Sequence, residues 1–209
     1  YRKLPYLGLG KGQSLSLRWE FGKLTQIELS YRDPWFLDTP TLLGADIYDT
    51  RSQYDTYTDK RAGFAVTAGR RIMVVDYSRV YLKYSLERRD LVPDQVTASD
   101  YVKSQAGSRT TSSVTLSFTR NSVDNPFFPR TGSRTSASAE WAGSWLGGNT
   151  AYQSYILDTS NFVAVPLLNS ALVFKIRTGL LDALGHAAYI PVYDRFLLGG
   201  TTLETVRGY

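Results

Sequence analysis

Alternation of apolar and polar side chains at every second position constrains this chain more than any other feature. From Ser14 to Phe21 the odd positions are leucine or aromatic, and the even positions are serine, arginine or glutamate. Successive side chains of a β-strand point to opposite faces, so this period predicts a strand with one apolar and one polar face. The pattern recurs over residues 26–31, 43–48, 63–68, 79–87, 113–119, 134–141 and 172–177.

The remaining long segment, 152–165, is strand-like in composition, but the phase of its alternation is unclear. We therefore expect about nine strands, with a remnant of another before Lys11. No segment has a convincing helical period, and all eight prolines fall outside the strand cores, as expected for a residue without a backbone donor. The sequence predicts an all-β fold.

Alternation alone leaves two environments open, because a soluble β-sandwich and a membrane β-barrel share it. No apolar run approaches the roughly 20 residues that a spanning helix needs, so a membrane protein of this sequence would be a barrel. Two of the connections expected at one end are long, 49–60 and 88–109, whereas those at the other end are short. Aromatic residues also gather near the expected strand ends, as in interfacial girdles. Both observations favour the barrel.

Residues suited to covalent or metal chemistry are scarce. The chain has no cysteine and one histidine, His186, which has no nucleophile motif around it. The glycine-rich segment 8–12 precedes an alternating strand, not the helix that a phosphate loop needs. A net charge of +5 without basic runs gives no indication of nucleic-acid binding. We expect no enzymatic activity, no cofactor, no metal site and no nucleic-acid partner.

Two motifs are more distinctive. The segment from Asp124 to Gly132 joins two strands and carries the residues of a fixed turn, Asp124, Asn125, Pro126, Pro129 and Gly132. The segment from Phe196 to Tyr209 is glycine-rich and nearly uncharged, yet it contains one arginine. Its notable residues are Gly199, Gly200, Val206, Arg207, Gly208 and Tyr209. An arginine in such surroundings is suited to bidentate pairing with a carboxylate, although an exposed loop arginine is equally compatible.

These residues resemble a known family. The paired glycines followed by 205–209 look like the signature loop of BamA-type outer-membrane assembly factors, of the bacterial surface antigen family. The Asp124–Gly132 segment looks like their periplasmic turn, and Ser30–Phe36 resembles an earlier strand end. The three motifs fall in the family's order and cover nearly the whole chain.

The resemblance implies a transmembrane, antiparallel, up-and-down β-barrel, of which this chain holds nine or ten of sixteen strands. Residues 1–209 would form one barrel fragment that ends within the sixth extracellular loop. Arg207 would belong to a clamp in the lumen, whose carboxylate partners lie beyond Tyr209. The implied place is the cell outer membrane of a Gram-negative bacterium. The implied partners are outer-membrane lipids, unfolded outer-membrane β-barrel proteins and accessory assembly lipoproteins.

The implied function is the folding and insertion of other barrel proteins into the outer membrane. A TamA-like factor or a two-partner secretion translocator shares the signature loop and stays open as an alternative. Two alternatives belong to other functional classes. One is a passive porin or receptor, and the other is a soluble β-sandwich binding module.

Overall fold

The computed structural model describes residues 12–54, 56–94, 96, 100–104, 106–168 and 170–184. They form nine strands: β1 (Ser14–Glu20), β2 (Leu24–Asp33), β3 (Thr41–Gln53), β4 (Tyr57–Ile72), β5 (Ser78–Pro93), β6 (Gly107–Asn121), β7 (Gly132–Ala142), β8 (Tyr152–Val165) and β9 (Ser170–Ala183). The connections hold the short helix α1 (Asp100–Ser104) and three 3-10 turns, η1 (Phe36–Asp38), η2 (Ser144–Leu146) and η3 (Pro166–Leu168). The expected strand before Lys11 lies outside the described residues.

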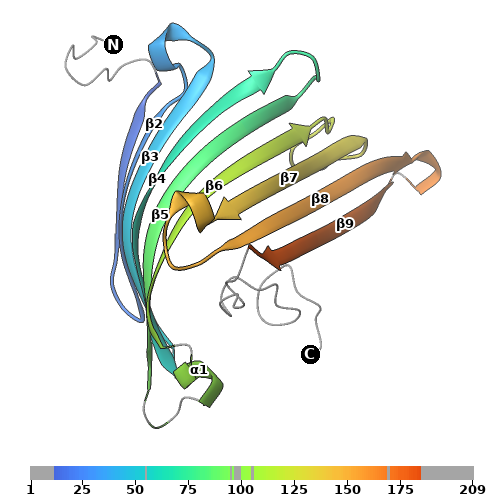
Figure 1. Ribbon diagram of the computed structural model, residues 1–209. Helices are drawn as coiled ribbons and strands as arrows, with labels where there is room; N and C mark the ends of the chain where they lie inside the picture. Colours follow the sequence, from blue (N-terminus) through green and yellow to red (C-terminus); the bar gives the residue numbers. More distant parts are fainter. Residues whose placement is uncertain are drawn as a thin grey trace.

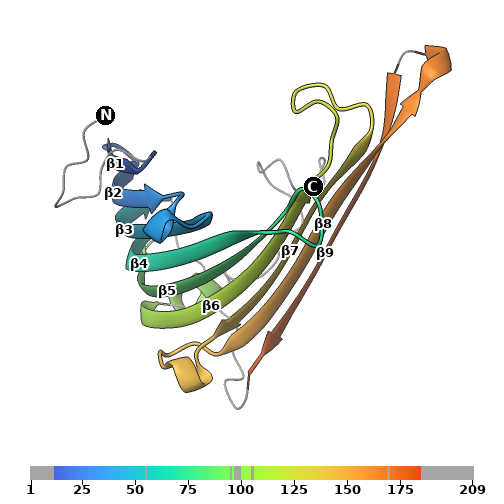
Figure 2. The same cartoon turned by 90° about the horizontal axis from the view of Figure 1, so that it is seen from above.

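All nine strands belong to one antiparallel sheet in which chain order and spatial order coincide, β1 through β9. The strands run side by side, with the β2–β3 and β4–β5 connections at one end and α1 at the other (Figure 1). Seen from above, the sheet is bent into an arc and does not close (Figure 2). The prediction of an all-β, up-and-down meander is confirmed, and the open edges β1 and β9 are those of a partial barrel.

Register aligns the apolar positions of neighbouring strands. Leu29 of β2 lies opposite Leu17 of β1 and Ile47 of β3, and that row continues through Phe64 of β4 and Leu86 of β5. A shift of one residue in any pair would turn one strand's apolar set to the other face. Because no such shift occurs, the apolar residues form one continuous face.

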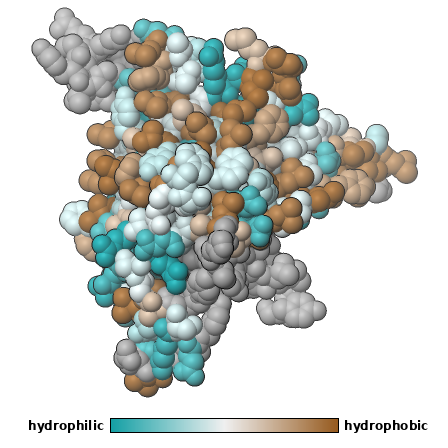
Figure 3. Space-filling view, in the orientation of Figure 1, coloured by the Kyte–Doolittle hydropathy of each residue, from teal (hydrophilic) through white to brown (hydrophobic). Residues whose placement is uncertain are grey.

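The two faces differ in exposure. The apolar residues Leu17 and Ile47 are 67% and 61% exposed, whereas Asp59 and Ser113 on the other face are 1% and 2% exposed. Side chains converge on the concave side of an arc and spread apart on the convex side, so the apolar face is convex and the polar face concave. In one view of the surface, hydrophilic side chains gather toward the end that carries α1 (Figure 3).

Several strands are longer than the alternation predicts. The connection expected at 49–60 is mostly strand, since β3 runs to Gln53 and β4 begins at Tyr57. The connection expected at 88–109 is likewise shortened by the extension of β5 and β6. The extensions of β3, β4 and β6 are polar on both faces, and that of β5 begins with three charged residues, so the hydrophobic period is lost although the backbone ladder continues. The predicted excess of long loops at this end is therefore mostly wrong for the described residues.

Two smaller differences concern helices and proline. The α1 turn has no apolar period because five residues make little more than one turn, which explains why the sequence did not indicate it. Pro93 is the last residue of β5, where its missing donor costs no ladder bond within the strand. Among the described residues, no helix combines the length and apolarity required to cross a bilayer.

Gly69 is a tightly packed position on the concave face. It lies opposite Tyr81, and a Cβ atom added to Gly69 would lie 2.4 Å from Cδ1 of the Tyr81 ring. The ring therefore covers the glycine backbone across the strand pair. Gly44, a buried glycine on the same face, has only ordinary contacts around its missing Cβ, the nearest at 3.7 Å.

We predict that Gly69→Ala destabilises the barrel, because the added methyl must displace the Tyr81 ring. Overpacking of this kind costs about 1–3 kcal/mol. Gly44→Ala is the matched control and should be neutral or slightly stabilising, because alanine loses less backbone entropy on folding. Urea unfolding of the complete protein in detergent measures both free energies. Equal effects of the two substitutions would contradict the packing role of Tyr81.

Candidate functional sites on the polar face and the Asp124–Gly132 turn

A polar recess of about 200 Å³ lies on the concave face, between β3, β5, β6, β7 and β8. Two carboxylates line it, Glu87 and Glu140. The Tyr48 hydroxyl donates to Oε2 of Glu87 at 2.7 Å, and the Tyr152 hydroxyl donates to Oε1 of Glu140 at 3.4 Å. Lys83 also lines the recess. These groups suit water, an amine or a guanidinium, and no apolar ligand.

The strongest ion cluster on this face joins β4 and β5. Asp59 is buried, and Arg89 donates to it twice, from Nε to Oδ1 at 2.8 Å and from a terminal nitrogen to Oδ2 at 2.6 Å. Arg61 adds a third bond, from Nε to Oδ2 at 3.0 Å. A bidentate guanidinium–carboxylate pair fixes geometry as well as charge, so the cluster ties the two strands together.

Further charges of both signs pair across β1, β2 and β3. Arg18 lies 3.9 Å from Glu28, Arg32 lies 3.7 Å from Asp46, and Ser30 donates to Asp46 at 2.6 Å. Among residues 12–184 as far as they are described, no group of three or more His, Cys, Asp or Glu side chains could hold a metal ion. The concave face is thus a mixed-charge, hydrogen-bonding surface.

The Asp124–Gly132 turn is closed by its own side chains. Oδ1 of Asp124 accepts from the backbone N–H groups of Arg130 at 2.9 Å and Thr131 at 3.1 Å. Oδ1 of Asn125 accepts from the N–H groups of Phe127 and Phe128 at 2.9 and 3.1 Å. These local acceptors replace ladder partners that the turn residues lack.

The turn is also anchored to the strands. Arg134 of β7 donates to the carbonyl of Pro126 at 2.7 Å, and its guanidinium lies 5.7 Å from the centre of the Phe162 ring. Gly132 has φ +102°, and a Cβ there would lie 2.3 Å from the carbonyl oxygen of Ser122. Both the dihedral and the close approach require glycine at this position.

The Asp124 carboxylate is stabilised in its charged form. Backbone hydrogen bonds from Arg130, and then from Thr131, hold the pKa of Asp124 below its ordinary value, although the group is exposed. Charge on Asp124 and closure of the turn are therefore linked.

The predicted site residues divide into two sets. Asp124, Asn125, Pro126, Pro129 and Gly132 lie together in one turn at the β6–β7 end. The signature-loop residues Gly199, Gly200, Val206, Arg207, Gly208 and Tyr209 lie outside the described residues. Any role of either set in function stays a prediction.

The sequence does not predict the Asp59–Arg89 pair, because Asp59 falls in the connection expected at 49–60. A signal existed: Asp59 and Arg61 are opposite charges two residues apart, hence on one face if the strand extends. Arg89 lies directly across from Arg61 in the register of β4 and β5. Asp59 and Arg89 are 30 positions apart, so their contact can be predicted only when the register of β4 against β5 is known.

An open antiparallel meander with an apolar convex face and a hydrogen-bonded, charged concave face is part of the wall of a β-barrel. The chain belongs to the Omp85 superfamily, whose domain matches residues 8–209. The resemblance identified from the glycine pair and the 205–209 motif is thereby confirmed at the level of the superfamily.

The relatives found are BamA proteins. The outer membrane protein assembly factor BamA of Nitratidesulfovibrio vulgaris is 28% identical over 203 residues, which are 96% of this chain and 25% of that protein. The protein of the same name from Neorickettsia risticii is 30% identical over 124 residues, or 59% of this chain and 16% of that protein. This chain thus spans about a quarter or less of the relatives it matches.

A solved structure has the same fold. The crystal structure of BamA from Haemophilus ducreyi lacking POTRA domains 1–3 matches 93% of this chain with a TM-score of 0.77. The match covers 40% of that chain at 20% sequence identity. This likeness establishes the barrel fold of the described strands.

We predict that Asp59→Ala destabilises the barrel by about 3 kcal/mol, since it leaves the mostly buried Arg89 without its bidentate partner. Asp90→Ala is the matched control, because Asp90 is only partly buried and pairs at 3.6 Å with Arg88, which is exposed. Exposed pairs contribute about 0–1 kcal/mol. Urea unfolding of the complete protein compares the two. A loss for Asp59→Ala no larger than for Asp90→Ala would contradict the role of the cluster.

We predict a pH-dependent turn. Because the pKa of Asp124 is lowered in the folded turn, its hydrogen bonds are complete above about pH 4, the ordinary carboxyl range. They are lost as the pH falls through the lowered pKa. NMR shifts of the Arg130 and Thr131 amides should follow this titration in wild type and stay flat in Asp124→Asn. A midpoint at or above the ordinary value would contradict the linkage.

Proposed function

We propose that this chain is part of the barrel of an outer-membrane protein assembly factor, which folds and inserts β-barrel proteins into the outer membrane of a Gram-negative bacterium. The observation that carries the proposal is the nine-strand meander with one unbroken apolar face, in a chain whose relatives are named BamA. Its partners would be outer-membrane lipids on the convex face, unfolded barrel proteins as substrates, and accessory assembly lipoproteins.

The width of the apolar face supports a membrane location. On β4 the convex positions change from charged to apolar and back, between exposed Lys60 and exposed Arg70. Residues 61–69 between these charges match the roughly 9–11 residues with which a tilted strand crosses a bilayer. The polar extensions of β3, β4 and β5 beyond Lys60 would then stand in water on the outer side.

Aromatic side chains lie where such a span would end. Trp19, Phe21, Trp35, Phe127, Phe128 and Trp145 are each more than half exposed. Trp19 and Phe21 lie together near the β1–β2 hairpin, with ring centres 4.8 Å apart. Amphipathic rings favour the boundary between acyl chains and headgroups, so the exposed aromatics support the same placement.

Within the proposed assembly factor, these strands would form a continuous part of the barrel and not its lateral gate. In the family that the sequence resembles, the first and last strands of the barrel form the lateral gate, and we propose that β1 to β9 are not among them. There an open edge would template an incoming strand by β-augmentation. The charged, hydrogen-bonded concave face would keep the lumen wet and the wall stiff while that edge opens.

Depletion of the complete protein tests the proposal. If it assembles other barrels, depletion lowers the amounts of several unrelated outer-membrane barrel proteins, and complementation restores them. Strong single-channel conductance together with unchanged levels of other barrels would instead assign it to the porins or receptors. A loss confined to one secreted partner would favour a two-partner secretion translocator.

The signature loop gives a sharper prediction. In the complete protein, Arg207→Ala should lower the levels of other barrel proteins more than it lowers expression of the variant itself, because the proposed clamp needs the guanidinium. Arg51→Ala is the control, since Arg51 is an exposed arginine at the end of β3. Quantitative immunoblots of outer membranes read out both. Barrel levels equal in Arg207→Ala and Arg51→Ala membranes would argue against the clamp.

A further inference from the structure

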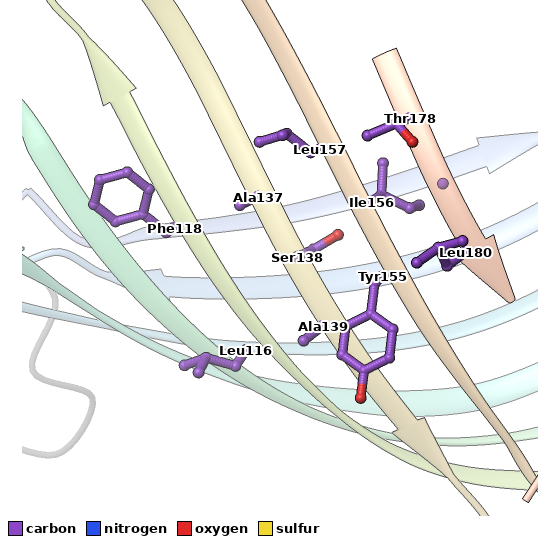
Figure 4. Close-up of a pocket in the computed structure, with 11 residues that line it drawn as sticks. Leu116, Phe118, Ala137, Ser138, Ala139, Tyr155, Ile156, Leu157, Thr178 and Leu180 are labelled. Atoms are coloured by element: carbon purple, nitrogen blue, oxygen red, sulfur yellow. The ribbon is translucent and has the colours of Figure 1, made fainter. Parts of the chain in front are cut away.

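An apolar furrow of about 490 Å³ runs over β6, β7, β8 and β9. Its floor is Ala137 and Ala139 of β7, and its sides are larger residues of the neighbouring strands, Leu116 and Phe118 on β6 and Leu157 on β8 (Figure 4). Two alanines at successive convex positions between large neighbours leave a groove parallel to the strand. Register confirms that these alanines lie directly beside the larger residues.

The furrow has a polar row at one end. One step beyond Phe118, Ala137 and Leu157, the register brings Arg120, Thr135 and Thr159 into line. The two threonine hydroxyls lie 3.0 Å apart. All three side chains occupy convex positions. Because one threonine hydroxyl donates to the other, one threonine hydrogen and the Arg120 guanidinium remain to donate to an outside acceptor.

The guanidinium of Arg120 has no anionic partner in the described part of the chain. Its Nε is buried and has no hydrogen-bond acceptor among the described residues. A half-buried cation without a carboxylate is costly, so this position favours an external anion.

The other end of the furrow has the opposite character. There the convex row is Trp141, Gln153 and Asp182, in which an amide and a carboxylate replace the guanidinium. An anionic headgroup is therefore attracted to the Arg120 end and repelled from the Asp182 end. This charge asymmetry orients an amphiphile along the groove.

We propose that the furrow is a binding site for one glycerophospholipid. An acyl chain lies over Ala137 and Ala139, and the phosphate accepts hydrogen bonds from Arg120, with Thr135 and Thr159 beside the glycerol esters. The inference rests on the proposed function in one respect, since it needs the convex face to meet lipid. With the β6–β7 turn on the periplasmic side, the lipid belongs to the inner leaflet of that membrane.

Native mass spectrometry of the complete, detergent-purified protein tests this site. After delipidation, phosphatidylglycerol is titrated back onto wild type, Arg120→Gln and Ala139→Leu. The first variant removes the charge and the second fills the groove. Matched controls are Arg70→Gln and Ala68→Leu, which change exposed residues of the same kind on the convex face of β4.

We expect one tightly held phospholipid on wild type and on both controls. Arg120→Gln and Ala139→Leu should bind it about tenfold more weakly, the factor for a lost charge-assisted hydrogen bond or a comparable loss of apolar contact. Excess inorganic phosphate should not displace the lipid, because the acyl chain contributes to binding.

Equal retention of the lipid by all five proteins would overturn the site. Displacement of the lipid by inorganic phosphate, or the finding of a bound peptide where the lipid is expected, would also overturn it. These results leave the proposed function standing if the variants remain in the outer membrane and support barrel assembly. A protein that is absent from membranes altogether would refute the proposed function instead.

Discussion

Strand register is the constraint on which the rest of this structure depends. Nine strands pair in chain order, and each pair holds apolar positions opposite apolar positions and polar positions opposite polar ones. A slip of one residue between β4 and β5 would place Phe64 beside Glu87 and separate Arg89 from Asp59. The backbone ladder alone does not choose the register, because it is satisfied after a slip of two. Side chains on both faces select it together.

The concave face adds specific contacts to that selection. Tyr48 reaches Glu87 across β4, and the Asp59 cluster joins β4 to β5. Gly69 admits the Tyr81 ring where no larger residue fits. The convex face contributes differently, since many of its large apolar residues remain exposed. The hydrogen bonds and ion pairs of the concave face thus help to select the strand register, whereas the apolar convex face would supply the free energy of insertion into a membrane.

Much of the fold could be predicted from the sequence, because alternation reports strand faces directly. Alternation predicts a strand wherever one face is apolar, as in β1 and most of β5. Alternation does not report a strand where both faces are polar, so it predicts a loop at the end of β3 and the beginning of β4. The phase of β8 was unclear because Ile156 and Phe162 occupy concave positions, the latter beside the Arg134 guanidinium.

The candidate sites were predicted unevenly for a related reason. The Asp124–Gly132 turn is local, and Asn, Pro and Gly specify it within nine residues, so the sequence could indicate it. Ion pairs such as Asp59 with Arg89 depend on contacts 30 positions apart, and no local pattern encodes them. The alanine floor of the furrow is equally a product of register. Alanine satisfies the alternation without showing that its neighbours are large.

The central claim is that acyl chains contact the convex face and water contacts the concave face. These 209 residues contain no cysteine. Single cysteines for nitroxide labels can therefore be introduced at each of positions 80–87 of β5 in the membrane-embedded protein, with any cysteine elsewhere in the complete protein replaced by serine. Accessibility to oxygen, which concentrates in lipid, should peak at 80, 82, 84 and 86. Accessibility to a water-soluble nickel complex should peak at 81, 83, 85 and 87. Inverted phases, or nickel access at all eight positions, would contradict the account.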